Sequence, residues 1–194
     1  MTLVLASSSK YRQNILAKLQ IPFVCHAPNI DETFFENESA QQLVYRLAKE
    51  KALKVADHYP DAFIIGSDQV ATYDQQIIGK PKDYQNAVEL LTSFSANLVN
   101  FYTGLCLYNA KNQSIQIKVV PFTIKFRELS RPEIDSYLEK TSPYNCAGGI
   151  KSEGLGVALF EKLIGDDPNT LQGLPLIMLI QMLKQEGVNP LLIK

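Results

Sequence analysis

Short apolar runs alternate with helical patterns along the chain, and this alternation predicts a mixed α/β fold. Apolar and alternating runs predict short strands at residues 2–6, 23–26, 63–68, 70–73, 76–78 and 157–160. Two longer extended runs lie between residues 98 and 127 and flank a turn-rich stretch at 109–112. Periodic apolar positions and capping residues predict helices after residue 9, from 39 to about 58, and at 83–91, 130–139 and 174–186. Because strands of both lengths occur, we expect α/β or α+β packing rather than a regular βαβ array.

One lysine interrupts the apolar face of the helix that is predicted to begin after Ser39. At about 100° per residue, Lys51 falls in the middle of the apolar stripe. The stripe consists of Ala40, Leu43, Val44, Leu47, Ala48, Val55 and Ala56. A lysine on such a face usually extends its ammonium group outward to water. The alternative is that Lys51 reaches a buried anionic site.

The composition is that of a globular protein without an excess of charge. Its 194 residues suffice for one large domain or two small lobes, and the formal net charge of −1 argues against a general nucleic-acid binder. Three widely separated cysteines form neither a metal spacing nor a disulfide framework, so we expect a reducing, cytoplasmic location. We expect no membrane association, because no leader pattern is present and the apolar run at 174–180 is too short to span a bilayer. His26 and His58 stand alone in the sequence and are expected to be surface or structural residues.

The segment that carries Asp68 is the most informative part of the sequence. An apolar run ends there in a carboxylate, and such strand ends often carry the catalytic residues of α/β proteins. Twelve residues later, Lys80 lies in a Gly-Lys-Pro turn, so an acid and a base flank one short hairpin. This arrangement predicts a site for a metal-bound phosphate. The alternative is that Asp68 only caps a turn or a helix.

Three distant segments combine small residues with charges, namely residues 6–12, 66–69 and 148–154. Small residues let a ligand approach the backbone, whose N–H groups bind phosphate oxygens. Arg12 and Lys80 could neutralise a polyphosphate, and Glu32 and Asp68 could hold Mg²⁺ or Mn²⁺. The sequence contains neither a Walker motif nor a dinucleotide fingerprint, which argues against a P-loop kinase and a Rossmann dehydrogenase.

In this order, the polar segments resemble those of the Maf family of nucleoside triphosphate pyrophosphatases, over nearly the whole chain. The shared motifs are residues 5–9 with Arg12, 31–32, 49–52, 66–70, 79–81, 101–104, 146–148, 151–154, 167–170 and 173–175. The resemblance implies a single Maf-like domain over residues 1–194. Its expected architecture resembles that of inosine triphosphatase, with a long bent mixed sheet flanked by helices and two lobes around a cleft. It also implies a divalent cation (Mg²⁺, Mn²⁺ or Co²⁺), a nucleoside triphosphate substrate and homodimers, which are common in the family.

The residue after the catalytic aspartate separates branches of the family. Members that resemble dTTP/UTP pyrophosphatases have Asp-Thr-Val there, whereas this chain has Asp-Gln-Val at 68–70 and Lys-Ser-Glu-Gly at 151–154. This is similar to the branch that acts on 7-methylguanosine triphosphate. The implied reaction is hydrolysis of the α–β phosphoanhydride to 7-methyl-GMP and diphosphate, which would clear modified nucleotides. A dTTP/UTP-type enzyme and a non-catalytic, nucleotide-binding regulator of septum formation are the alternatives.

The resemblance assigns a role to each site residue. Asp68 is implied as the proton acceptor, and Glu32 joins it at the metal. The implied phosphate-binding residues are Ser7, Arg12, Lys51 and Lys80, and the implied specificity residues are Tyr11, Gln69 and Glu153. A 7-methylated guanine is cationic, so stacking on Tyr11 and hydrogen bonding to Glu153 would favour it. The chain departs from the family pattern at Lys10, where proline is usual, and at residues 149–150, where this branch often has Ser-Phe.

Overall fold

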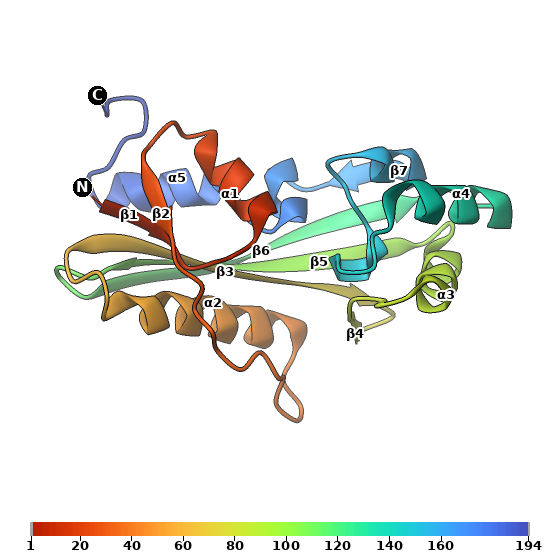
Figure 1. Ribbon diagram of the computed structural model, residues 1–194, viewed down its shortest axis with the longest axis horizontal. Coiled ribbons are helices and arrows are strands. Elements are labelled where there is room, and N and C mark those ends of the chain that lie inside the picture. The colour runs from red at the N-terminus through yellow and green to blue at the C-terminus, as the bar shows by residue number, and fades with distance from the viewer. Residues whose placement is uncertain (1, 194) are drawn as a thin grey trace. The chain divides into compact units, whose positions relative to one another are not determined.

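The computed structural model describes residues 2–193, whose seven strands form one mixed sheet (Figure 1). The strands are β1 (Thr2–Leu5), β2 (Phe23–Cys25), β3 (Ala62–Tyr73), β4 (Gln76–Ile78), β5 (Leu98–Asn109), β6 (Ser114–Phe126) and β7 (Phe160–Ile164). Their order is β2-β1-β3-β5-β6-β7, with β4 paired to β3. Strand β1 pairs in parallel with β2 and β3, whereas the β3–β4 and β6–β7 pairs are antiparallel. The predicted mixed α/β fold is therefore confirmed.

The described residues contain five α-helices and three short 3₁₀ helices. The α-helices are α1 (Lys10–Ala17), α2 (Ala40–Ala56), α3 (Tyr84–Phe94), α4 (Arg131–Thr141) and α5 (Leu176–Gln185). The 3₁₀ helices are η1 (Ala147–Gly149), η2 (Leu155–Leu159) and η3 (Pro168–Gln172). Ser39 begins α2 with the predicted capping box, in which its hydroxyl accepts from the Gln42 N–H and Gln42 accepts from the Ser39 N–H. No helix in this part of the chain has the length and apolar character needed to cross a membrane.

The chain divides into two compact units. The first unit comprises the residues up to Gln69, Thr103–Val120 and the residues from Asn169 onward. The second unit comprises Val70–Tyr102 and Pro121–Pro168. Strands β3, β5 and β6 contribute residues to both units. The single domain with a cleft between two lobes stays a prediction.

In the first unit, helices cover both faces of the sheet. Helices α1 and α5 lie on one face and α2 on the other (Figure 1). The alternation of β1 explains the two layers, because Leu3 and Leu5 pack with α1 and α5, whereas Val4 packs with α2. Every one of these side chains is almost completely buried. The core of this unit therefore holds β1 and β3 between two layers of helices.

Helix α2 packs unusually close to the sheet, and two glycines permit this contact. A Cβ atom at Gly66 of β3 would lie 2.1 Å from the Ala48 carbonyl oxygen. A Cβ atom at Gly104 of β5 would lie 1.9 Å from the Val44 carbonyl oxygen. No side chain fits at these distances, so the helix backbone rests on the strand backbones. This close contact brings the α2 residue Lys51 within reach of β3.

In the second unit, aromatic side chains form much of the packing. Phe94 of α3 contacts Tyr73 and Phe126, with ring centroids 5.5 Å and 5.3 Å away. Phe126 also meets Phe160, the first residue of β7, at 5.7 Å in an edge-to-face arrangement. Helices α3 and α4 pack against each other in the same unit.

Two predicted strand boundaries are wrong. Strand β3 does not end at Asp68 but continues to Tyr73, because β4 pairs with its second half from Ala71 onward. Polar residues in the middle of this strand look like a strand end in the sequence. The strand predicted at residues 157–160 is displaced, since η2 occupies Leu155–Leu159 and β7 begins at Phe160.

Candidate functional site

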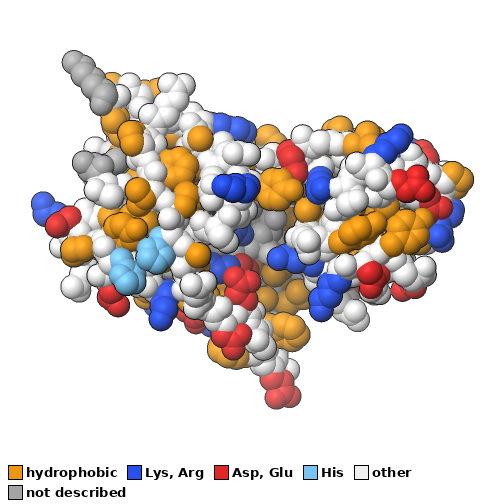
Figure 2. All heavy atoms as spheres, in the orientation of Figure 1, with side chains coloured by type: hydrophobic (Ala, Val, Ile, Leu, Met, Phe, Trp, Pro, Cys, Tyr) orange, Lys and Arg blue, Asp and Glu red, His pale blue; other side chains and the backbone are white. Residues whose placement is uncertain are grey.

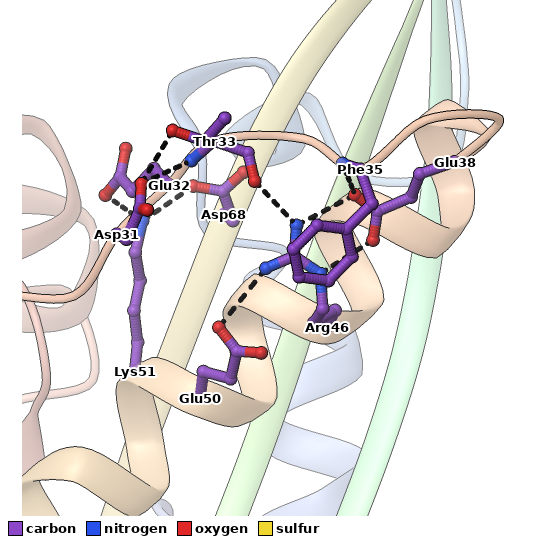
Figure 3. A network of polar contacts seen from close by, with 9 residues as sticks. All are labelled: Asp31, Glu32, Thr33, Phe35, Glu38, Arg46, Glu50, Lys51 and Asp68. Carbon is purple, nitrogen blue, oxygen red and sulfur yellow. Dashed lines mark hydrogen bonds and ion pairs between the residues drawn. The ribbon is translucent and has the colours of Figure 1, made fainter.

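Two carboxylates of the first unit converge on one buried ammonium group (Figure 3). The Nζ atom of Lys51 lies 2.6 Å from Asp68 Oδ1 and 2.7 Å from Glu32 Oε1. The side chains of Lys51 and Asp68 are 5% and 10% exposed, whereas that of Glu32 is 59% exposed. Lys51 therefore does not turn outward to water. Of the two alternatives, the structure agrees with a lysine that reaches buried anionic groups, and these groups are carboxylates of the chain itself.

Arg12 belongs to the same cluster of charges. The serine Ser9 caps α1 by accepting a hydrogen bond from the Arg12 backbone N–H, which places Arg12 in the first turn. Its Nε atom donates to the Gly173 carbonyl oxygen at 2.9 Å, and Nη1 lies 3.5 Å from Ser7 Oγ. Burial lowers the pKa of Arg12, while the nearby charges of Asp68 and Glu32 oppose this shift. An arginine keeps its proton in proteins, so the guanidinium stays a cation that faces two carboxylates.

Gly173 leaves the space that Arg12 occupies. Its φ angle is +89°, and a Cβ atom there would lie 3.0 Å from Arg12 Nε. The Gly173 carbonyl also accepts a 2.8 Å hydrogen bond from Ser67 Oγ, which is equally close to the Gly104 carbonyl. The loop at Gly173 therefore ties Arg12 to the strand that carries Asp68.

The neighbouring residue Gln69 is held by two threonines. Its Nε2 atom lies 2.9 Å from Thr103 Oγ1 and 2.6 Å from the Thr170 carbonyl oxygen, and Thr103 Oγ1 lies 3.2 Å from the same carbonyl. Both threonines are completely buried. The sequence marked them only as members of two motifs and assigned them no role, because threonine is common in strands and turns.

The donor set fits a divalent cation with an incomplete protein shell. Carboxylate oxygens are the ligands that Mg²⁺ prefers, and Glu32 and Asp68 already share one cation, Lys51. Among residues 2–193, no group of three or more His, Cys, Asp or Glu side chains is arranged to hold a metal. Mg²⁺ is commonly bound by one or two carboxylates, with water and substrate phosphates as the other ligands. The metal therefore stays a prediction that these residues can accommodate.

The remaining predicted site residues lie elsewhere in the chain. Tyr11 is in the first turn of α1 beside Arg12 and is 38% exposed. Lys80 and Glu153 are exposed residues of the second unit. Lys80 lies on a groove of about 520 Å³ that also includes Lys82 and Glu89. The first unit thus brings together Ser7, Arg12, Glu32, Lys51 and Asp68. The roles of all the predicted site residues stay predictions.

The two histidines do not stand alone. His26 and His58 stack on each other with ring centroids 4.9 Å apart, and Figure 2 shows the pair on the surface. The Nδ1 atom of His26 also lies 3.4 Å from the Tyr59 hydroxyl. The pair joins the end of β2 to the end of α2, which agrees with a structural role.

Sequence comparisons relate the chain to one family. The sequence model of the family described as Maf-like protein matches residues 2–186. A protein of Colwellia psychrerythraea (strain 34H / ATCC BAA-681), named 7-methyl-GTP pyrophosphatase, is 55% identical over 190 residues, which cover 98% of this chain and 95% of that protein. The Staphylococcus aureus Ham1 protein is 13% identical over 66% of this chain and 73% of that chain, with a TM-score of 0.45. A HAM1 protein from Coxiella burnetii is 15% identical over 65% and 73% of the two chains, with the same TM-score of 0.45.

Proposed function

The chain belongs to the Maf family, and we propose that it is a pyrophosphatase that hydrolyses 7-methyl-GTP to 7-methyl-GMP and diphosphate. The relative with the name 7-methyl-GTP pyrophosphatase supports the substrate. One structural observation carries the reaction: the buried carboxylate of Asp68 lies in an ion pair with Lys51, beside Glu32 and Arg12. A base, cations and a potential metal ligand are thus present within one unit.

The proposed reaction is attack of water on the α-phosphorus. The new bond joins the water oxygen to the α-phosphorus, and the anhydride bond to the β-phosphate breaks. The bridging oxygen leaves with its electron pair on diphosphate, while the water proton passes to the carboxylate of Asp68. Arg12 and Lys51 hold the phosphate oxygens, Arg12 as a planar donor and Lys51 as a point charge. A phosphate-binding role for Lys80 stays a separate prediction.

A divalent cation fits this site through Glu32 and Asp68. Mg²⁺, Mn²⁺ or Co²⁺ bound there would neutralise phosphate charge. The proposal also includes a cytoplasmic location, because the three cysteines are odd in number and far apart in the sequence, which is typical of proteins of a reducing compartment. We propose a homodimer as the working assembly, which light scattering of the purified chain tests directly.

The reaction is tested with Asp68→Asn. Release of diphosphate from 7-methyl-GTP should fall on the order of 10²- to 10⁴-fold, the usual contribution of a general base. Asp61→Asn, at an exposed position before β3, is the matched control and should keep full activity. Nucleotide binding and circular dichroism of Asp68→Asn show whether the variant is folded. Undiminished turnover by a folded Asp68→Asn protein would remove Asp68 from the mechanism.

Two further measurements test which phosphorus is attacked and which nucleobase is preferred. Hydrolysis in H₂¹⁸O should place the heavy oxygen in 7-methyl-GMP, whereas label in diphosphate would mean attack at the β-phosphorus. A panel of kcat/KM values for 7-methyl-GTP, GTP, dTTP, UTP and CTP, measured with each of the three metals, tests the base preference. A preference for dTTP or UTP would assign the chain to the other branch. Binding without turnover of any nucleotide would favour a regulatory protein.

A further inference from the structure

Both hydrogens of the Gln69 side-chain amide form hydrogen bonds within the first unit. The Nε2 atom donates to Thr103 Oγ1 at 2.9 Å and to the Thr170 carbonyl oxygen at 2.6 Å. An amide nitrogen carries two hydrogens, so these two contacts use its whole donor capacity. Gln69 is half-buried, and the acceptors are fully buried.

The backbone of Thr170 decides which way the amide points. The amide nitrogen and oxygen of a glutamine look alike in shape, so the orientation has to follow from the partners. A carbonyl oxygen can only accept hydrogen bonds. With the amide reversed, two acceptor oxygens would face each other at the 2.6 Å distance that separates Nε2 from Thr170. The orientation with Nε2 toward Thr170 is therefore the stable one.

Thr103 fixes the second hydrogen of the amide. Its hydroxyl has one hydrogen, which it donates to the same Thr170 carbonyl at 3.2 Å. Toward Gln69 the hydroxyl is therefore an acceptor, which matches the donor that Nε2 presents. Thr103, Thr170 and Gln69 form a closed set of three hydrogen bonds whose directions all follow from one backbone carbonyl.

We propose that Thr103 is a positioning residue for base selection, which holds Gln69 so that its amide oxygen Oε1 meets the substrate. This inference rests on the proposed function and specifies the direction of the hydrogen bonds between Gln69 and the base. Gln69 accepts hydrogen bonds from the base and donates none. The groups it can read are N–H donors, such as the ring N1–H and the N2 amine of 7-methylguanine. Gln69 Oε1 cannot bind the carbonyl oxygens of a base, because both atoms are hydrogen-bond acceptors.

The test is a kinetic comparison of wild type with Thr103→Val, which keeps the branched shape and removes the hydroxyl. One lost hydrogen bond should lower the ratio of kcat/KM for 7-methyl-GTP over ATP, whose ring N1 is an acceptor where guanine has N1–H, by roughly three- to tenfold. The effect should appear mainly as a raised KM for 7-methyl-GTP, since the hydroxyl takes no part in the bond cleavage. Thr103→Ser keeps the hydroxyl and should restore the ratio.

Thr72→Val is the matched control on the neighbouring strand. Thr72 is also a buried threonine, and its hydroxyl makes a long contact of 3.5 Å with the Asn100 carbonyl. Its loss should leave the selectivity ratio unchanged. An unchanged ratio in a folded Thr103→Val protein that cleaves 7-methyl-GTP would overturn the positioning role.

A measurement on the wild-type protein keeps the inference testable even where Thr103→Val fails to fold. In ¹⁵N-labelled protein, the two side-chain amide hydrogens of Gln69 should exchange with water far more slowly than those of Gln85, whose amide is exposed. Fast exchange of both Gln69 hydrogens would refute the fixed orientation. A wild-type chain that cleaves no nucleotide refutes the proposed function and the substrate role of Thr103 together, while the exchange rates still decide the orientation of the amide.

Discussion

Replacement of Lys51 by methionine should destabilise the protein far more than loss of an ordinary lysine. Methionine keeps the length of the side chain and removes the ammonium group, which leaves Asp68 buried without its partner. Breaking a buried ion pair in this way costs about 3–5 kcal/mol. The contact with Glu32 adds little, because Glu32 is 59% exposed and pairs at exposed positions are worth about 0.2–1 kcal/mol.

Urea unfolding at neutral pH measures the effect. With a slope of about 3 kcal/mol per molar urea, the loss corresponds to a midpoint shift of about 1–2 M. Lys49→Met, at an exposed position of the same helix, is the matched control and should shift the midpoint little. The double variant Lys51→Met/Asp68→Leu removes both charges and should recover much of the lost stability.

The size of the Lys51→Met effect decides between two arrangements. If Lys51 carried an exposed ammonium group, Lys51→Met would resemble Lys49→Met, and the double variant would show no recovery. Either result would contradict the buried ion pair. A large effect of Lys51→Met together with recovery in the double variant would mean that Lys51 and Asp68 stabilise the fold as a buried pair.

Three further predictions concern packing, pH and a buried hydroxyl. Gly104→Ala should cost roughly 3 kcal/mol, because its Cβ would meet a helix carbonyl at 1.9 Å, whereas Gly79→Ala, with nothing within 4 Å, should be neutral in thermal unfolding. Hydrogen bonds from Ser130 lower the pKa of Glu133 from 4.5 to about 2, so its contribution to stability is complete above pH 4.5 and is lost as pH falls toward about 2. The difference in Tm between wild type and Glu133→Gln should therefore shrink with acidification, and a constant difference would refute this. The buried Thr170 hydroxyl has no hydrogen-bond partner among residues 2–193, so Thr170→Val should stabilise the fold by roughly 1 kcal/mol in urea unfolding, and a loss of stability would indicate a bound partner.

Much of the fold follows from local sequence patterns. The helices begin where the caps predict, as the capping box of Ser39 and the cap of Asp83 show. Strand β1 was recognisable from its continuous apolar run. The run is apolar because both faces of this strand are buried. The boundaries at Asp68 and Phe160 could not be predicted, since pairing with β4 and with β6 decides them.

The sequence pattern singled out Lys51 but gave no role to the two buried threonines beside Gln69. Lys51 was visible because a charge on an apolar stripe conflicts with the helix pattern around it. Thr103 and Thr170 cause no such conflict, because threonine is common in strands and turns. Their importance arises from contacts across 34 and 101 residues of sequence with Gln69, which no local pattern contains.

The four charged side chains of the candidate site lack the positive charge that is needed to bind a triphosphate. Arg12 and Lys51 face Glu32 and Asp68, so the formal charges of the four side chains cancel before any nucleotide is present. A triphosphate brings several further negative charges, which two already paired cations cannot offset, and close like charges in a partly buried site are costly. Under the proposed function, a divalent cation held by Glu32 and Asp68 would supply the missing positive charge. Lys51 then has two functions, because it pairs with Asp68 when no nucleotide is bound and would share its ammonium group with phosphate oxygens when the substrate binds.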